Sequence, residues 1–420
     1  MKDFYVLHGD ILYADEERRI REERDSYLVV RDGKVEEITS RIPASTAVLD
    51  YDGCLIIPGL IDQHLHAPQY QFAGLFMDKE LLEWLNSHTF PEEGKYADLS
   101  YARKAYSIFV SDLVQSETTR FSAFATIHED ASLLLSSMLE ESGLSGYVGK
   151  VNMDSNSPDY LTEDTEESIS STISFIERMK DFKNVRPIIT PRFIPSCSKR
   201  LLIELGKISE SRHIPVQSHL DENISEIEWV RELVPESRNY ADAYRAHGLW
   251  GREKTIMAHV VWPSDEEYEL LKNSNIYVAH SPSSNSNLSS GIAPVRKMLD
   301  SGIKIALATD VAGGSSLSIM RMMTHAVEVS KLYYRYVDST MRPLTFSEVF
   351  YIATRMAGSF FGSVGSFDEG MDADILVLDT SGIHTSIYEE LSLSERLELY
   401  AYRRAGSPLK AKFVKGRKIL

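Results

Sequence analysis

The chain has 420 residues, of which 62 are acidic and 45 are Lys or Arg, and its formal net charge is −17. Such a charge would repel a phosphate backbone, because non-specific affinity for nucleic acid comes largely from basic side chains. We therefore expect no nucleic-acid partner. A small neutral substrate is compatible with the charge, since long-range steering acts on charged ligands.

The cysteine count and the hydropathy pattern indicate where the protein works. Cys54 and Cys197 are the only cysteines, too few for a disulfide framework. The N-terminal segment carries charged residues where a signal peptide needs an apolar run. No apolar stretch approaches the roughly 20 residues that a membrane helix needs. These features predict a cytoplasmic protein with no membrane partner.

Residues 1–57 are predicted to form short strands around turns. Asp32 and Gly33 lie between two segments of alternating apolar residues, where a hairpin turn is expected. The segment is therefore predicted to be the N-terminal part of a small β domain.

The pattern changes at Pro58, where short β-branched segments begin to alternate with longer helical ones. This alternation is typical of βα units and a parallel sheet. Eight such strands close a (β/α)8 barrel of the TIM type, and we predict one over residues 58–365. The predicted strands are 56–66, 119–128, 146–154, 185–193, 214–222, 255–262, 276–282 and 303–310.

Helices are predicted between these strands, where apolar residues recur at helical spacing. Three examples are 100–116, 165–180 and 198–212, and packing against the barrel explains their apolar faces. Residues 366–420 contain further strand-like segments. The simplest arrangement returns them to the N-terminal strands, so that both ends of the chain form one small β domain in an α/β protein.

His64 and His66 flank Leu65 near the end of the first predicted barrel strand. Side chains alternate faces along a strand, so both imidazoles project to the same side and could chelate a metal ion. Taken alone the motif is weak, because most His-x-His pairs in strands are structural.

Further polar residues lie at the ends of other predicted strands. His219, His259 and Asp310 stand at the ends of the fifth, sixth and eighth strands, where barrel enzymes carry catalytic groups. Imidazoles with one carboxylate suit Zn²⁺, with Fe²⁺ as the second choice. We therefore predict a metal site at the barrel mouth.

Glu222 follows His219 by three positions and could reach the mouth without ligating the metal. A metal that activates water, beside a carboxylate that moves its proton, is suited to hydrolysis. The alternative is a solvated acid in the first turn of a helix, where the helix dipole favours it.

Nine segments spread over most of the barrel resemble the motifs of a known family: PGLIDQHLHAPQYQFAG, LLEWLNSHTFP, FATIHEDASLLL, GKVNMD, ITPRF, QSHLDEN, MAHVVW, SNLSSG and ATDVAGG. Through these motifs the sequence resembles the amidohydrolase superfamily and, within it, the guanine deaminases. The resemblance implies hydrolytic deamination of guanine to xanthine and ammonia by a homodimer.

The resemblance also implies roles for individual residues. It implies one zinc ion per chain, with His64, His66, His219 and Asp310 as ligands. It makes Glu222 the general acid and base, with His259 and Asp310 as further catalytic groups. The residues that it implies contact the purine are His66, Gln69, Arg192, Phe193 and Glu222.

Two alternative functions remain open. The protein could be another amidohydrolase that deaminates a pterin or a cytosine-like ring. Arg192 and Gln69 are the residues that would discriminate guanine from such a ring. A catalytically inactive scaffold would have lost metal ligands, and none is lost here.

Residues 185–193 contain no Lys that could bridge two metals, so one metal is favoured. The cytidine-deaminase type of zinc enzyme needs a Pro-Cys-x-x-Cys segment, which this sequence lacks.

Overall fold

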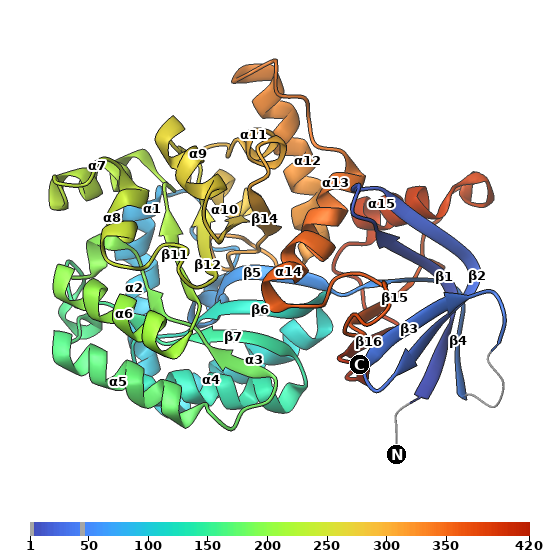
Figure 1. Ribbon diagram of the computed structural model, residues 1–420, viewed down its shortest axis with the longest axis horizontal. Coiled ribbons are helices and arrows are strands. Elements are labelled where there is room, and N and C mark those ends of the chain that lie inside the picture. The colour runs from blue at the N-terminus through green and yellow to red at the C-terminus, as the bar shows by residue number, and fades with distance from the viewer. Residues whose placement is uncertain (1–3, 43–46) are drawn as a thin grey trace.

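A barrel and a smaller sheet lie side by side in the computed structural model, which describes residues 4–42 and 47–420 (Figure 1). Residues 1–3 and 43–46, which belong to the predicted N-terminal part of the small β domain, lie outside the described residues. Within the described ranges, no helix has both the length and the apolar character needed to cross a bilayer.

The small sheet combines strands from both ends of the chain, as the sequence predicts. Its order is β17-β16-β15-β4-β1-β2-β3, and β15 pairs antiparallel with β4. The strands are β1 (Phe4–Ala14), β2 (Ile20–Arg31), β3 (Lys34–Thr39), β4 (Ala47–Pro58), β15 (Ile375–Asp379), β16 (Ala411–Val414) and β17 (Arg417–Lys418).

The predicted hairpin turn lies between β2 and β3. Asp32 and Gly33 have φ angles of 51° and 79°, and two consecutive positive φ angles match the twist of the flanking strands. A Cβ on Gly33 would meet the carbonyl oxygen of Lys415 at 2.6 Å. The turn therefore requires glycine both for its conformation and for its close approach to the C-terminal strands.

The barrel contains the eight predicted strand regions in parallel. Two four-stranded arcs, β5-β6-β7-β9 and β11-β12-β13-β14, are joined by hydrogen bonds at both seams. Ile189 bridges to Val216 at one seam, and Asp310 N donates to His64 O over 2.9 Å at the other. The strands are β5 (Leu60–His66), β6 (Thr118–Phe124), β7 (Ser145–Gly149), β9 (Val185–Pro187), β11 (Val216–Leu220), β12 (Thr255–His259), β13 (Ile276–His280) and β14 (Lys304–Leu307), with the short pair β8 (Val151–Asn152) and β10 (Thr190–Pro191) extending β7 and β9.

One predicted strand boundary is wrong. The first barrel strand was expected to begin at residue 56, but residues 56–58 complete β4 and pair with β15 in the small sheet. The chain crosses to the barrel at Gly59, where a Cβ would meet Thr119 Oγ1 at 2.0 Å. This close approach leaves no room for a side chain at the crossing.

Helices surround the barrel (Figure 1). The three predicted helices correspond to α3, α5 and α6, and the apolar positions of α3 that recur at helical spacing, such as Ala102, Tyr106 and Phe109, are buried. The helices of this layer are α3 (Leu99–Gln115), α4 (Glu129–Ser142), α5 (Thr165–Arg178), α6 (Lys199–Arg212), α7 (Ile224–Leu233), α8 (Tyr240–Ala246), α9 (Asp265–Lys272), α10 (Pro282–Asn287), α11 (Val295–Asp300), α12 (Ile319–Tyr336), α13 (Phe346–Tyr351) and α14 (Ala357–Phe361), while α15 (Leu393–Arg404) contacts the small sheet.

A helical insertion separates β5 from α3. It begins with the short helix η1 (Ala67–Phe72) and continues through α1 (Leu81–Trp84), η2 (Leu85–Thr89), α2 (Phe90–Gly94) and η3 (Lys95–Ala97). The turn η2 has π-helical hydrogen bonding, which is frequent at functional sites. This insertion supplies one side of the pocket described below.

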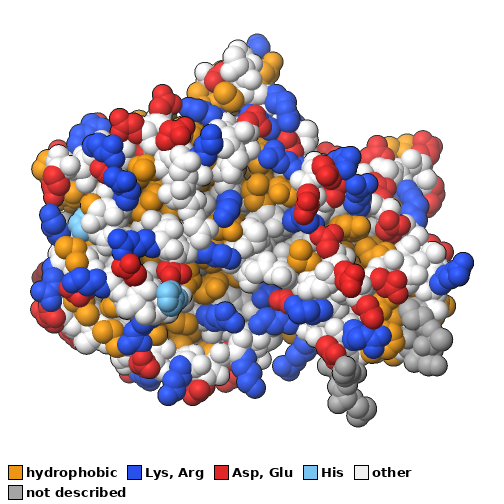
Figure 2. Space-filling model, in the orientation of Figure 1, with side chains coloured by type: hydrophobic (Ala, Val, Ile, Leu, Met, Phe, Trp, Pro, Cys, Tyr) orange, Lys and Arg blue, Asp and Glu red, His pale blue; other side chains and the backbone are white. Residues whose placement is uncertain are grey.

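The net charge of −17 is not gathered into one patch on the face shown in Figure 2. Lys and Arg side chains alternate there with Asp and Glu over both the barrel and the small sheet. This face therefore presents no extended surface of a single sign.

Candidate active site

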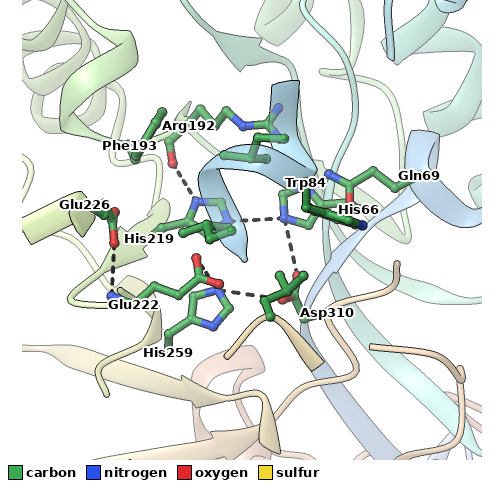
Figure 3. A pocket seen from close by; sticks show the side chains of 13 residues that line it. His66, Gln69, Trp84, Arg192, Phe193, His219, Glu222, Glu226, His259 and Asp310 are labelled. Carbon is green, nitrogen blue, oxygen red and sulfur yellow. Dashed lines mark hydrogen bonds and ion pairs between the residues drawn. The ribbon is translucent and has the colours of Figure 1, made fainter. Parts of the chain in front are cut away.

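The polar residues predicted at strand ends meet at one mouth of the barrel, where Figure 3 shows His66, His219, His259 and Asp310. His64 and His66 lie on β5, His219 on β11 and His259 at the end of β12. Asp310 follows β14 by three residues. The strands are parallel, so their C-terminal ends bring these side chains together.

Three imidazole nitrogens converge at the centre of the mouth. His66 Nε2 lies 3.2 Å from His64 Nε2 and 3.2 Å from His219 Nε2. His64, His66 and His219 each offer a ligand atom within 4.8 Å of the others. Three nitrogens this close suit a shared metal ion, because neutral imidazoles gain little from contacting one another.

Asp310 and His259 complete a second, overlapping group. Asp310 Oδ1 lies 3.1 Å from His64 Nε2 and 3.5 Å from His66 Nε2, and Asp310 Oδ2 lies 3.7 Å from His259 Nε2. The φ angles of His259 and Asp310 are 75° and 46°. Left-handed conformations are costly for residues other than glycine and cluster at functional sites.

The backbone and a buried amide orient two of the imidazoles. His219 Nδ1 lies 2.6 Å from Arg192 O, and His259 Nδ1 lies 2.9 Å from Asn285 Oδ1. Both acceptors favour a proton on Nδ1, which leaves each Nε2 lone pair facing the mouth. Contacts of this kind fix the tautomer of metal-binding histidines.

The protonation of the cluster fits a metal ion. Burial lowers the pKa of His64, and it lowers the pKa of His66 and His219 well below the ordinary value, so all three imidazoles are neutral at neutral pH. Burial opposes ionisation of Asp310, but His64 and His259 outweigh it and lower the pKa of that carboxyl. Neutral imidazoles with one carboxylate are the donors that Zn²⁺ and Fe²⁺ take.

Glu222 points into the same pocket from the loop after β11 (Figure 3). The N-cap of α7 is Asn223, so Glu222 precedes the helix rather than occupying its first turn. Its backbone N–H donates to Glu226 Oε2 over 3.1 Å, and its Oε2 lies 3.4 Å from His259 Nε2. Burial and the charge of Asp310 raise the pKa of Glu222 well above its ordinary value, which suits a group that accepts and returns a proton.

The pocket beside the histidines is lined on its other side by residues suited to a planar polar ring. Arg192 and Gln69 lie along one edge and Phe193 stands at the side (Figure 3). All three are buried. The residues that line the pocket are His66, Gln69, Leu81, Trp84, Leu85, Arg192, Phe193, His219, Glu222, Glu226, His259, Leu288 and Asp310.

Several residues of this site have no assigned role in the sequence analysis. Leu81, Trp84 and Leu85 come from the helical insertion. Their segment, LLEWLNSHTFP, matches a family motif, but the sequence predicts no role for these three residues. Asp62 accepts a 3.0 Å hydrogen bond from Thr309 N, which ties β5 to the end of β14. Asp62 lies two positions before His64, and nothing in its sequence context indicates that it contacts the end of β14.

Two further histidines at strand ends lie outside the cluster. Burial lowers the pKa of His128, and it lowers that of His280 to about 3. Neither belongs to the two ligand groups found among the described residues or lines the pocket. The structure thus separates them from the residues at the mouth.

The fold and site define the class of protein. The model of the amidohydrolase family matches residues 55–416, which include the whole barrel and β15 and β16. The chain therefore belongs to the amidohydrolase family.

The proteins similar to this chain include several guanine deaminases. The guanine deaminase of Dictyostelium discoideum is 37% identical over 405 residues, which cover 94% of this chain and 88% of that protein. The guanine deaminase of Homo sapiens is 41% identical over 332 residues, 77% of this chain and 72% of that protein. A crystal structure of guanine deaminase from C. acetobutylicum with guanine in its active site is 42% identical, with a TM-score of 0.96 over 100% of both chains.

Proposed function

We propose that the protein catalyses the hydrolytic deamination of guanine to xanthine and ammonia, with one zinc ion per chain. The observation that carries the proposal is that a histidine and carboxylate cluster and a ring-sized polar pocket share one buried mouth. The similarity to guanine deaminases supports guanine as the ring.

Four side chains would hold the metal: His64, His66, His219 and Asp310. When bound there, zinc lowers the pKa of a water molecule and so supplies a nucleophile at neutral pH. Zinc is preferred to Fe²⁺ because three imidazoles and one carboxylate form a usual zinc set. No Lys lies among residues 185–193, which supports one ion rather than a bridged pair.

Arg192, Gln69 and Phe193 would bind and orient the purine. Guanidinium donors pair with the O6 and N7 acceptors of guanine, and an aromatic face can stack on a base. His66 and Glu222 also line the pocket and would face the reacting edge of the ring. In this pose the C2 amino group would lie at the metal side of the mouth.

Glu222 would move the protons of the reaction. It takes a proton from the attacking water as the new bond to C2 forms, and gives a proton to ring N3. Glu222 would then carry the proton of the new C2 hydroxyl to the amino group, so that the C2–N bond breaks, ammonia leaves and the C2 carbonyl of xanthine forms. His259, 3.4 Å from Glu222, would hydrogen-bond the attacking water, and Asp310 would ligate the metal or accept the proton of that water.

Purified protein incubated with guanine tests the proposal directly. Xanthine and ammonia should form in equal amounts, with adenine, cytosine and a pterin as comparison substrates. Faster turnover of adenine, cytosine or the pterin would contradict guanine as the substrate while leaving the hydrolytic site in place. A protein that binds zinc and turns over none of the four would favour an inactive scaffold.

We also infer a homodimer in the cytoplasm, with no nucleic acid or membrane among its partners. Leu332, Tyr336 and Val337, at the end of α12 and just after it, expose 47%, 79% and 60% of their surfaces, and this end of the helix projects from the barrel (Figure 1). Such an apolar patch favours a protein contact. Cys54 and Cys197 are both free thiols, in keeping with a reducing compartment. Light scattering of purified protein tests the dimer, and cell fractionation tests the compartment.

A further inference from the structure

Glu93 joins the two side chains assigned to the purine. Its Oε2 accepts a 2.6 Å hydrogen bond from Arg192 Nη1, and its Oε1 accepts a 2.8 Å hydrogen bond from Gln69 Nε2. Glu93 lies on α2 of the helical insertion and is 3% exposed. One buried carboxylate thus holds both residues at once, although it does not line the pocket itself.

The orientation of the Gln69 amide is fixed from two sides. Its Oε1 accepts a hydrogen bond from Ala312 N over 3.3 Å, while its Nε2 donates to Glu93. Reversing the amide would place its oxygen against the carboxylate and its NH2 against the Ala312 N–H. Glu93 and Ala312 therefore leave Gln69 with a second N–H that can donate into the pocket.

Arg192 is fixed in the same way. The hydrogen bonds that its side chain makes with described residues start from Nη1, and its guanidinium lies 5.1 Å from the centre of the Phe90 ring. The remaining guanidinium N–H groups are left for a ligand. Arg192 and Glu93 form an ion pair. The negative charge of Glu93 balances the positive charge of Arg192, so this side of the pocket carries no net charge.

We propose that Glu93 is a positioning residue that sets the specificity of the pocket for a neutral, oxo-bearing ring. It aims the free donors of Arg192 and Gln69 at the ring and cancels the positive charge that would otherwise favour anionic purines. The inference rests on the proposed function, since it concerns how the same pocket recognises its substrate.

Glu93→Gln tests the proposal. In the glutamine an NH2 group replaces one of the two accepting oxygens, so either Gln69 or Arg192 would face a donor and must turn away. A buried polar group left unpaired costs about 1–3 kcal/mol, or roughly 5- to 150-fold. The KM for guanine should therefore rise about 10- to 100-fold, with kcat reduced less than about tenfold, because ground-state binding and transition-state binding weaken together.

An anionic purine tests the charge. Urate carries a negative charge at neutral pH and should inhibit Glu93→Gln more strongly, relative to guanine binding, than it inhibits the wild type. Glu93→Asp keeps the charge but is too short to reach both partners. It should raise the KM while preserving the wild-type preference against urate, and it decides the positioning role if Glu93→Gln does not fold.

Glu348→Gln is the matched control. Glu348 forms another buried pair with an arginine, at 2.5 Å from Arg296 Nη2, on α13 and outside the pocket-lining residues. This variant should keep the wild-type KM and the wild-type response to urate.

The outcomes separate the two levels of inference. Wild-type turnover of guanine with unchanged KM in Glu93→Gln and Glu93→Asp would overturn the role of Glu93 alone. An equal change in the control and in the Glu93 variants would also overturn it, since the effect would then be general loss of stability. A wild type that does not deaminate guanine would instead refute the proposed function.

Discussion

One side of the pocket is built from the barrel strands, whereas the other depends on an insertion. His64, His66, His219 and His259 lie within or at the ends of strands whose backbone is fixed by the ladder. Gln69, Trp84 and Glu93 lie instead on short helices between β5 and α3. The two regions therefore differ in what they contribute. Backbone hydrogen bonds between the barrel strands hold the reacting groups rigidly, and the insertion shapes the part of the pocket that would contact the purine ring.

This division predicts that changes in the histidine and carboxylate cluster act on turnover. Changes in the insertion, or in Arg192, which donates a hydrogen bond to Glu93 of the insertion, should act on recognition.

His219→Ala should have the largest effect. It removes one of three converging nitrogens, and zinc content should fall from about one equivalent per chain to near zero. Activity should fall by more than the roughly 10²–10⁴-fold that a general acid–base group contributes. Metal analysis of the purified variant, with circular dichroism to confirm folding, measures both. Two tightly held ions in the active wild type would show that the site is misassigned.

Glu222→Gln should come next. The amide keeps the shape of the carboxyl group but cannot carry a proton from water to the ring. The expected loss is about 10²–10⁴-fold in kcat, with the metal retained and the KM little changed. Steady-state kinetics on metal-loaded protein tests this. If kcat stays within a few-fold of the wild type, the proton must be moved by His259 or Asp310 instead.

Arg192→Gln should act on recognition. Losing a bidentate donor pair to a purine costs about 1–3 kcal/mol, or roughly 5- to 150-fold. The loss should appear in kcat/KM for guanine relative to adenine, mostly through KM, with zinc content unchanged. A variant that loses kcat as strongly as Glu222→Gln would break the division between the two sides of the pocket.

The same division explains how much could be predicted from the sequence. Strand ends in a parallel barrel share one mouth, so His64, His66, His219, His259 and Asp310 could be brought together from the pattern alone. The fold class follows from the eight alternating units and from the return of the C-terminal strands to β4, which the structure confirms.

The insertion could not be predicted in this way. Its helices are short and their faces are set by contacts with the pocket, so no long apolar period marks them. Glu93 illustrates the limit, because its role depends on contacts with Gln69 and Arg192, which lie 24 and 99 positions away. The start of the first barrel strand after Gly59 could not be predicted for a similar reason. Gly59 packs closely against Thr119, which lies 60 positions away in the sequence.

The smallest expected effect on activity comes from a pair outside both sides of the pocket. Glu348 accepts hydrogen bonds from Arg296 and Arg342 over 2.5 and 2.8 Å. Burial alone would raise the pKa of Glu348, but these hydrogen bonds outweigh it and lower the pKa from 4.5 to about 2. A carboxyl group whose pKa is lower in the folded protein stabilises the fold above its unfolded pKa. Its contribution is therefore full above about pH 5 and is lost as the pH falls from 4.5 towards 2.

Glu348→Gln should lower the free energy of unfolding by about 1–3 kcal/mol at pH 7, because the neutral amide accepts more weakly from two charged donors. The deficit relative to the wild type should shrink as the pH falls from 5 to 3. In that range the carboxyl group of Glu348 takes up a proton in the unfolded wild-type chain but not in the folded protein, which stabilises the unfolded wild type. Glutamine still suits the capping box with Thr345, so the helix should persist. Urea unfolding at several pH values measures the deficit, and kcat/KM for guanine at pH 7 should stay within about twofold of the wild type. A deficit that stays constant with pH would show that shape, rather than charge, is what Glu348 contributes, and altered kinetics would show that the barrel wall and the pocket are coupled.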